Sequence, residues 1–158
     1  MPPLSPLPTF ARYSCERHVY GLVEKADIEQ FLDKSLSEDV DIVIIGCPNA
    51  TMKEIREAAD AVSGKTLAAE LWVFTSPVMR VEAEKLGLAQ IIRDAGGMMI
   101  SESCTATMPP TTLSNRGRKA PATNSSKMVY YLEGHQKTLA HYGSTQRCLQ
   151  AAITGKWV

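Results

Sequence analysis

Short apolar runs alternate with segments of helical character, and this alternation is the feature that most constrains the fold. Residues 40–45 form a dense β-branched run, which is typical of a strand buried on both faces. Further strands are expected at 71–75, 98–103, 119–123 and 139–142. Pro121 restricts the fourth of these strands to a sheet edge or a strand end. Because strands that alternate with helices are joined by right-handed crossovers, the sequence predicts a Rossmann-like α/β domain of three layers, with a mainly parallel sheet of about four or five strands.

Local signals indicate where the connecting helices begin. Thr51 and Glu54 form a capping-box pair, and Ser76 is followed by Pro77 at the favoured first helical position. Ser144 is a further candidate N-cap. Helices are expected at 24–36, 51–64, 76–87, 88–95, 125–132 and 144–154, and a loop at 105–118.

Residues 1–20 are expected to form a disordered, proline-rich leader, and residues 21–158 the folded domain. Prolines at positions 2, 3, 6 and 8 disfavour a helix in the leader, and its pattern is not that of a secretory signal. Without such a signal, the four cysteines favour a reducing compartment, in which they are thiols or metal ligands rather than disulfides. The expected location is the cytoplasm.

Charge and motif content exclude several classes of partner. The 17 basic and 17 acidic residues balance, so nothing electrostatic favours nucleic acid or an anionic membrane. The longest apolar run, around residues 42–45, is too short to span a bilayer. The sequence has neither a Gly-x-Gly-x-x-Gly nor a Walker motif, so the classical dinucleotide and P-loop sites lack their main support.

Small, polar or metal-binding residues follow the predicted strands. In parallel sheets, ligands bind beyond the carboxyl ends of the strands, so these residues are expected at one edge. They are Cys47, Asn49, Thr75, Ser76, Cys104, Thr123, Asn124, Ser125 and Lys127. If the first and third strands are neighbours, as is frequent in doubly wound sheets, Cys47 and Cys104 come together.

These residue types favour a metal and an anion at that edge. Cys47 precedes a predicted helix N-terminus, which favours the thiolate that iron or an iron–sulfur cluster requires. Residues 123–127 offer hydroxyls, an amide, free helix N–H groups and an ammonium, a plausible seat for a carboxylate or phosphate.

Each feature also has a purely structural interpretation. A single cysteine at a strand end is more often a small buried apolar residue, and only the shared position of Cys47 and Cys104 makes metal binding an equal alternative. Residues 123–127 are equally consistent with a helix cap. Cys148 is expected in the core and Cys15 in the leader. The three histidines, His18, His135 and His141, lack the spacing of a zinc site.

Several of these segments resemble the catalytic domain of the aconitase X family. The similar segments are the strand and Gly-Cys-Pro-Asn turn at 40–49, the strand at 71–76, Ser-Cys at 103–104, Ala-Thr-Asn-Ser-Ser-Lys at 122–127, and the ending from Tyr-Gly-Ser to Gly-Lys-Trp at 142–157. The resemblance covers about residues 40–158 and implies the C-terminal part of the large subunit, with an aconitase-superfamily fold. The chain departs from it at Asn49, where many members have histidine, and in the more basic stretch at 114–119.

The resemblance implies an iron-dependent hydro-lyase that dehydrates a small hydroxy acid such as cis-3-hydroxyproline or 5-phosphomevalonate. It makes Cys47 and Cys104 two of three cysteine ligands of an iron–sulfur cluster or a mononuclear iron, with the third in an upstream region that this chain lacks. Asn49, Thr75, Ser76, Thr123, Asn124, Ser125 and Lys127 are then expected to bind the substrate. The family's catalytic serine lies on a small swivelling subunit or domain, the expected partner, so the isolated chain is expected to be inactive. The alternative is a truncated, non-catalytic relative that serves as a metal-free small-molecule-binding or interaction module.

Overall fold

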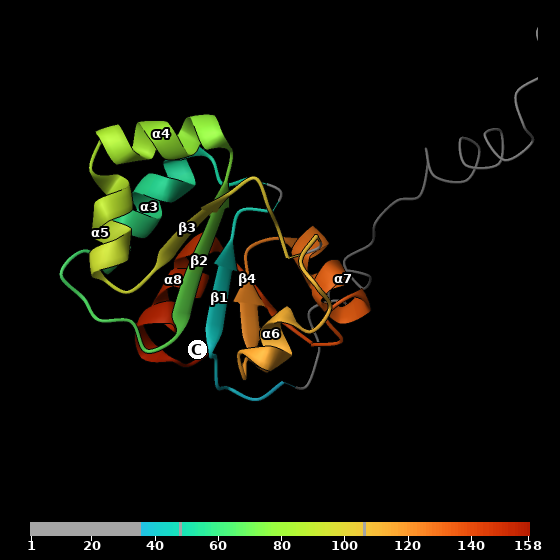
Figure 1. Ribbon diagram of the computed structural model, residues 1–158. Helices are drawn as coiled ribbons and strands as arrows, with labels where there is room; N and C mark the ends of the chain where they lie inside the picture. Colours follow the sequence, from blue (N-terminus) through green and yellow to red (C-terminus); the bar gives the residue numbers. More distant parts are fainter. Residues whose placement is uncertain (1–35, 48, 106) are drawn as a thin grey trace, which may run out of the picture. The chain divides into compact units, whose positions relative to one another are not determined.

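The computed structural model describes residues 36–47, 49–105 and 107–158 (Figure 1). They contain a five-stranded sheet in the order β3-β2-β1-β4-β5, and every neighbouring pair of strands is parallel. The strands are β1 (Ile42–Ile45), β2 (Glu70–Thr75), β3 (Met98–Ser101), β4 (Pro121–Thr123) and β5 (His141–Tyr142). The predicted α/β fold with a mainly parallel sheet is confirmed.

Helices cover the sheet because the side chains of its strands alternate between two apolar faces. Val43 and Ile45 of β1 belong to a core shared with α3 (Met52–Val62), α5 (Leu88–Asp94) and α8 (Thr145–Thr154). Ile42 and Ile44 are also fully buried but lie outside that core, as the period of two along a strand requires. The remaining helices are α4 (Pro77–Lys85), α6 (Thr112–Asn115) and α7 (Ser126–Gly134), of which α7 contacts β4 and β5.

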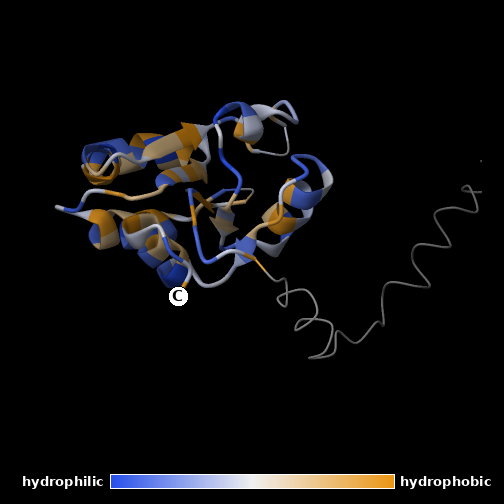
Figure 2. Ribbon diagram, turned by 90° about the horizontal axis from the view of Figure 1, so that it is seen from below, coloured by the Kyte–Doolittle hydropathy of each residue, from blue (hydrophilic) through white to orange (hydrophobic). Residues whose placement is uncertain are grey.

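The helices are amphipathic, as expected for elements that bury one face against a sheet. Figure 2 shows them striped with hydrophobic and hydrophilic residues. In the part of the chain that the structure describes, no helix combines the length and the apolar character needed to cross a membrane.

The N-caps predicted for three helices are confirmed. Thr51 and Glu54 form the capping box of α3, and Ser76 accepts a hydrogen bond from the Met79 amide, with Pro77 at the start of α4. Ser144 caps α8 in the same way. These signals are local, so the sequence alone identifies them.

Two predictions that depended on longer-range arrangement are wrong. β1 lies between β2 and β4 while β3 is at the edge, so the first and third strands are not neighbours. The segment 105–118, predicted as a loop, contains the short helix α6, whose buried Leu113 anchors it. β3 also ends at Ser101 instead of residue 103, because Glu102 turns the chain with φ of 64°. Pro121 does stand at a strand end, as the first residue of β4.

The leader at 1–20 and the helix predicted at 24–36, apart from Leu36, lie outside the described residues, as do Cys15 and His18.

The two ends of the described domain are hydrogen-bonded to each other. The Val40 amide donates to the Gly155 carbonyl (2.9 Å), and the Trp157 amide donates to the Glu38 carbonyl (2.7 Å). Between them, Asp39 and Lys156 form an antiparallel bridge and an ion pair. The segment that leads into β1 is therefore held beside the segment that leaves α8.

Candidate functional site

Cys47 lies in the turn after β1, and only glycine fits at the position before it. Gly46 is buried and has φ of 84°, in the left-handed region that favours glycine. A Cβ added there would lie 2.2 Å from the Phe74 carbonyl oxygen and 2.4 Å from the Ala50 amide nitrogen. The Gly-Cys pair seen in the sequence is therefore a steric requirement of this turn.

The turn is held from the side of β2. The Ala50 amide donates to the Phe74 carbonyl (2.7 Å), and the Thr75 hydroxyl donates to the Ala50 carbonyl (3.0 Å). Thr75 is only 1% exposed, so its hydroxyl serves the backbone of the turn.

The turn is also held from the side of β4. The Asn124 Oδ1 atom accepts a hydrogen bond from the Gly46 amide (3.4 Å), and the Ser125 hydroxyl donates to the Cys47 carbonyl (3.3 Å). Because β1 lies between β2 and β4, the turn that carries Cys47 is fixed by both neighbouring strands.

Cys104 lies on the long loop after β3, which is tied to α7. The buried Thr105 hydroxyl contacts the Met128 sulfur, and the Gln136 Nε2 atom donates to the carbonyls of Thr105 (3.2 Å) and Pro109 (3.1 Å). Gln136 is 5% exposed. Cys104 thus reaches the carboxyl edge of the sheet through this loop, although β3 does not adjoin β1.

The two thiols are half-buried. Burial is the main cause that raises the pKa of the Cys47 thiol above its ordinary value. The hydrogen bond with Ser125 partly offsets it, and the charges of Cys104, which raises the pKa, and Lys127, which lowers it, contribute less. The predicted effect of a helix N-terminus is therefore outweighed, because α3 begins only at Met52 and burial disfavours the charged thiolate.

A polar cavity of about 340 Å³ opens beside Cys47. Asn49 and Ser126 line it and are exposed, and Lys127 follows on the first turn of α7. Its full lining is Gly46, Cys47, Asn49, Glu54, Asn124, Ser125, Ser126 and Tyr142. Of the predicted site residues after β1 and β4, Cys47, Asn49, Asn124 and Ser125 therefore line one cavity, whereas Thr123 and Lys127 are not part of its lining.

Other predicted site residues have partners within the protein. Thr123 is fully buried and accepts a hydrogen bond from the Ser125 amide, and Ser76 caps α4. Ser125 itself accepts a hydrogen bond from the Met128 amide and so caps α7. The sequence marks Glu54 only as a capping residue and carries no motif at Gln136. Their roles depend on contacts between residues 27 to 70 positions apart.

Cys148 is fully buried in the core, as predicted, and its burial raises the pKa of its thiol to about 12. Among the residues outside the gaps at 1–35, 48 and 106, no three His, Cys, Asp or Glu side chains gather closely enough to hold a metal ion.

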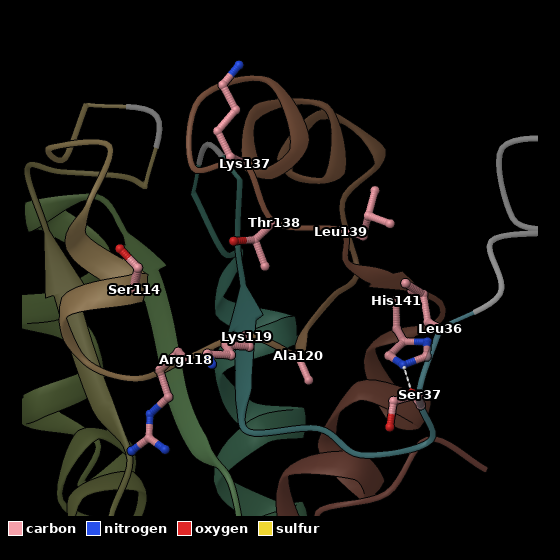
Figure 3. Close-up of a pocket in the computed structure, with 10 residues that line it drawn as sticks. All are labelled: Leu36, Ser37, Ser114, Arg118, Lys119, Ala120, Lys137, Thr138, Leu139 and His141. Carbon is pink, nitrogen blue, oxygen red and sulfur yellow. Dashed lines mark hydrogen bonds between the residues drawn. The ribbon is translucent and has the colours of Figure 1, made fainter.

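A second cavity, of about 360 Å³, lies at the amino edge of the sheet (Figure 3). It is lined by residues that precede β1, β4 and β5, among them Ser37, Lys119 and Thr138. His141 lines it and forms a hydrogen bond between its Nε2 atom and the Ser37 carbonyl (2.8 Å), whereas the Lys137 side chain points away from the other labelled residues. This cavity is separate from the cysteines, which lie at the carboxyl edge.

Comparison with known proteins agrees with this arrangement. Residues 40–154 match the aconitase X third domain. The chain is similar to the phosphomevalonate dehydratase large subunits of Methanocaldococcus jannaschii, with 32% identity over 114 residues, and Methanosarcina mazei, with 26% identity over 136 residues. These alignments cover 72% and 85% of this chain but only 28% and 32% of the relatives.

A solved structure shows the same fold. The holo form of aconitase X from Thermococcus kodakaraensis matches with a TM-score of 0.71 and 26% identity, over 82% of this chain and 33% of that one. The chain therefore spans about a third of the length of its relatives. With the matched domain covering most of the chain and both cysteine loops inside it, the protein belongs to the aconitase X family.

Proposed function

We propose that this chain supplies Cys47 and Cys104 to the iron centre of an aconitase X-type hydro-lyase. The observation that carries the proposal is that both thiols stand on loops held by α7. Its N-cap Ser125 donates to the Cys47 carbonyl, and its Met128 contacts the hydroxyl of Thr105, the residue after Cys104. Sulfur donors of this kind suit an iron–sulfur cluster or a mononuclear iron. Two of the three ligands expected for the family are then in place, and the third comes from outside this chain.

The cavity beside Cys47 is the proposed substrate site. Asn49, which lines the cavity, and Lys127, on the first turn of α7, offer an amide and an ammonium to the carboxylate or phosphate of a small hydroxy acid. The Ser125 hydroxyl has already donated its proton to the Cys47 carbonyl, so it shapes the site instead. Thr75, Ser76, Thr123 and Asn124 shape the site through the contacts described above. An iron held in part by Cys47 and Cys104 would supply Lewis acidity, which would make a hydroxyl of the substrate a better leaving group.

The relatives indicate the reaction class and the missing parts. Two similar chains are large subunits of phosphomevalonate dehydratases, which favours a phosphorylated hydroxy acid such as 5-phosphomevalonate, with cis-3-hydroxyproline as the alternative substrate. The name large subunit also supports a small-subunit partner, the swivelling domain predicted above. A reduced iron–thiolate site further favours the cytoplasm as the place of action.

A metal-free role is the second candidate. The raised pKa of Cys47 favours its neutral thiol, and a chain that spans a third of its relatives is compatible with a binding or interaction module without catalysis. Iron content separates the two functions.

The test is iron quantitation beside a dehydration assay with both substrates. Purified without oxygen, the isolated chain is expected to carry little iron and to be inactive. Adding the absent large-subunit region and the small subunit should restore both properties, and Cys47→Ser or Cys104→Ser should remove them again. Cys148→Ser is the matched control and should leave iron content unchanged. Full iron loading of the reconstituted enzyme without Cys47 and Cys104 would refute the proposal.

A further inference from the structure

The Asn124 side chain connects four elements at the candidate site. It extends from the end of β4, its Oδ1 atom accepts from the Gly46 amide (3.4 Å), and its Nδ2 atom donates to Glu54 of α3 (2.8 Å) and Thr145 of α8 (3.0 Å). A primary amide has two N–H donors, and both are used here. Asn124 is therefore engaged within the protein and has no N–H left for a substrate.

Glu54 determines which way this amide faces. A carboxylate only accepts hydrogen bonds, so the Glu54 Oε1 atom requires the NH₂ group of Asn124 on the side of α3 and leaves the carbonyl toward Gly46. The Thr145 hydroxyl can donate or accept and imposes no orientation. Glu54 is itself fixed, because its Oε2 atom accepts from the Thr51 amide and hydroxyl, both at 2.8 Å.

We propose that Asn124, oriented by Glu54, is a positioning residue that sets the place of the Cys47 thiol relative to the Cys104 thiol. The Gly46 amide that it holds is one residue before Cys47, and Ser125 holds the Cys47 carbonyl from the next position of the same strand end. This inference rests on the proposed function, because that function makes the two thiols iron ligands. The position of one thiol relative to the other can be measured without iron.

The experiment measures how fast phenylarsine oxide bridges the two thiols. The reagent forms two sulfur–arsenic bonds only where two thiols lie close together, and its oxygen leaves as water with the two thiol protons. The full chain carries Cys15→Ser and Cys148→Ala, so that Cys47 and Cys104 are the thiols that react. Iodoacetamide, which modifies one thiol at a time, reports their separate reactivity.

The expected results follow from the amide geometry. Asn124→Ala should slow bridging by about tenfold, because a tenfold change in rate corresponds to the free energy of about one hydrogen bond. The iodoacetamide rates should change little. Asn124→Asp, of nearly the same shape, should slow it as well because two carboxylates then face each other. Combining Asn124→Asp with Glu54→Gln should restore the rate, since the new glutamine can donate to the new aspartate. Thr145→Val is the matched control, which removes a hydrogen bond of the same amide without reorienting it, and should leave bridging nearly unchanged.

Several outcomes would overturn the inference. One is bridging of the Asn124→Asp chain at the parent rate with the fold retained by circular dichroism. Another is a double variant no faster than Asn124→Asp alone, and a third is a parent chain whose thiols are not bridged at all. Failure of the proposed function is a separate result: bridging that depends on Asn124, together with a reconstituted enzyme that never binds iron, would leave the positioning role intact and remove the metal.

Discussion

Replacing Gly46 with alanine should be among the most damaging small substitutions in this domain. A residue with a Cβ loses about 1–2 kcal/mol in the left-handed region. The new methyl group would also meet the Phe74 carbonyl oxygen at 2.2 Å, so the turn must move and the hydrogen bond from the Ala50 amide to that oxygen (2.7 Å) breaks. Leaving a buried carbonyl unsatisfied costs a further ~1–3 kcal/mol. We expect a total loss of about 2–5 kcal/mol in the free energy of unfolding.

Gly64→Ala is the matched control for this substitution. Gly64 also has a positive φ, 67°, but a Cβ there meets nothing within 4 Å, so only the conformational cost applies. Urea unfolding followed by tryptophan fluorescence measures both variants, and Gly46→Ala should lose at least ~1 kcal/mol more than Gly64→Ala. Equal losses in the two variants would show that the turn relaxes freely and would refute the steric argument.

Three further predictions concern groups that are fully or partly buried. Thr75→Val should cost about 1–3 kcal/mol in urea unfolding, because it leaves the Ala50 carbonyl without its donor, whereas Thr154→Val, whose hydroxyl bonds are exposed, should cost about 0.5 kcal/mol or less. Burial raises the pKa of the Cys148 thiol from 9.0 to about 12, so the stability that this thiol contributes should be lost as pH rises from 9 toward 12. Cys148→Ala should therefore make the free energy of unfolding depend less on pH over that range, and an unchanged slope would contradict this. Burial raises the pKa of Glu70, but Arg116 and Arg118 outweigh burial and lower it overall. The stability that Glu70 contributes is therefore lost as pH falls through 4.5 and below, and Glu70→Gln should make this loss smaller. Identical curves of unfolding free energy against pH for the two proteins would argue against the ion pairs.

The sequence predicted the features that local chemistry determines. The capping residues Thr51, Ser76 and Ser144 act within their own helix starts, so their effect does not depend on the rest of the chain. The position of Cys47 after a buried parallel strand follows in the same way, because strand ends in this fold meet at one edge.

What the sequence could not predict depends on contacts between distant residues. The order of strands places β4 beside β1 and β3 at the edge, and nothing in the residues of β3 specifies which neighbour it takes. The approach of Cys104 depends on Gln136, which is 32 positions away along the chain and has no motif to mark it. Burial of Cys47 reverses the predicted direction of its pKa for a similar reason, since the packing around a turn is set by several segments together.

The pairing of residues 38–40 with 155–157 places the first and last segments of the sheet domain side by side. A folded unit whose two ends adjoin can be inserted into a longer polypeptide without separating the segments on either side of it, and it tolerates circular permutation. In a family whose large subunits are about three times as long, an engineer could exchange this domain between relatives by cutting at one place, with both junctions only a few residues from the Asp39–Lys156 ion pair.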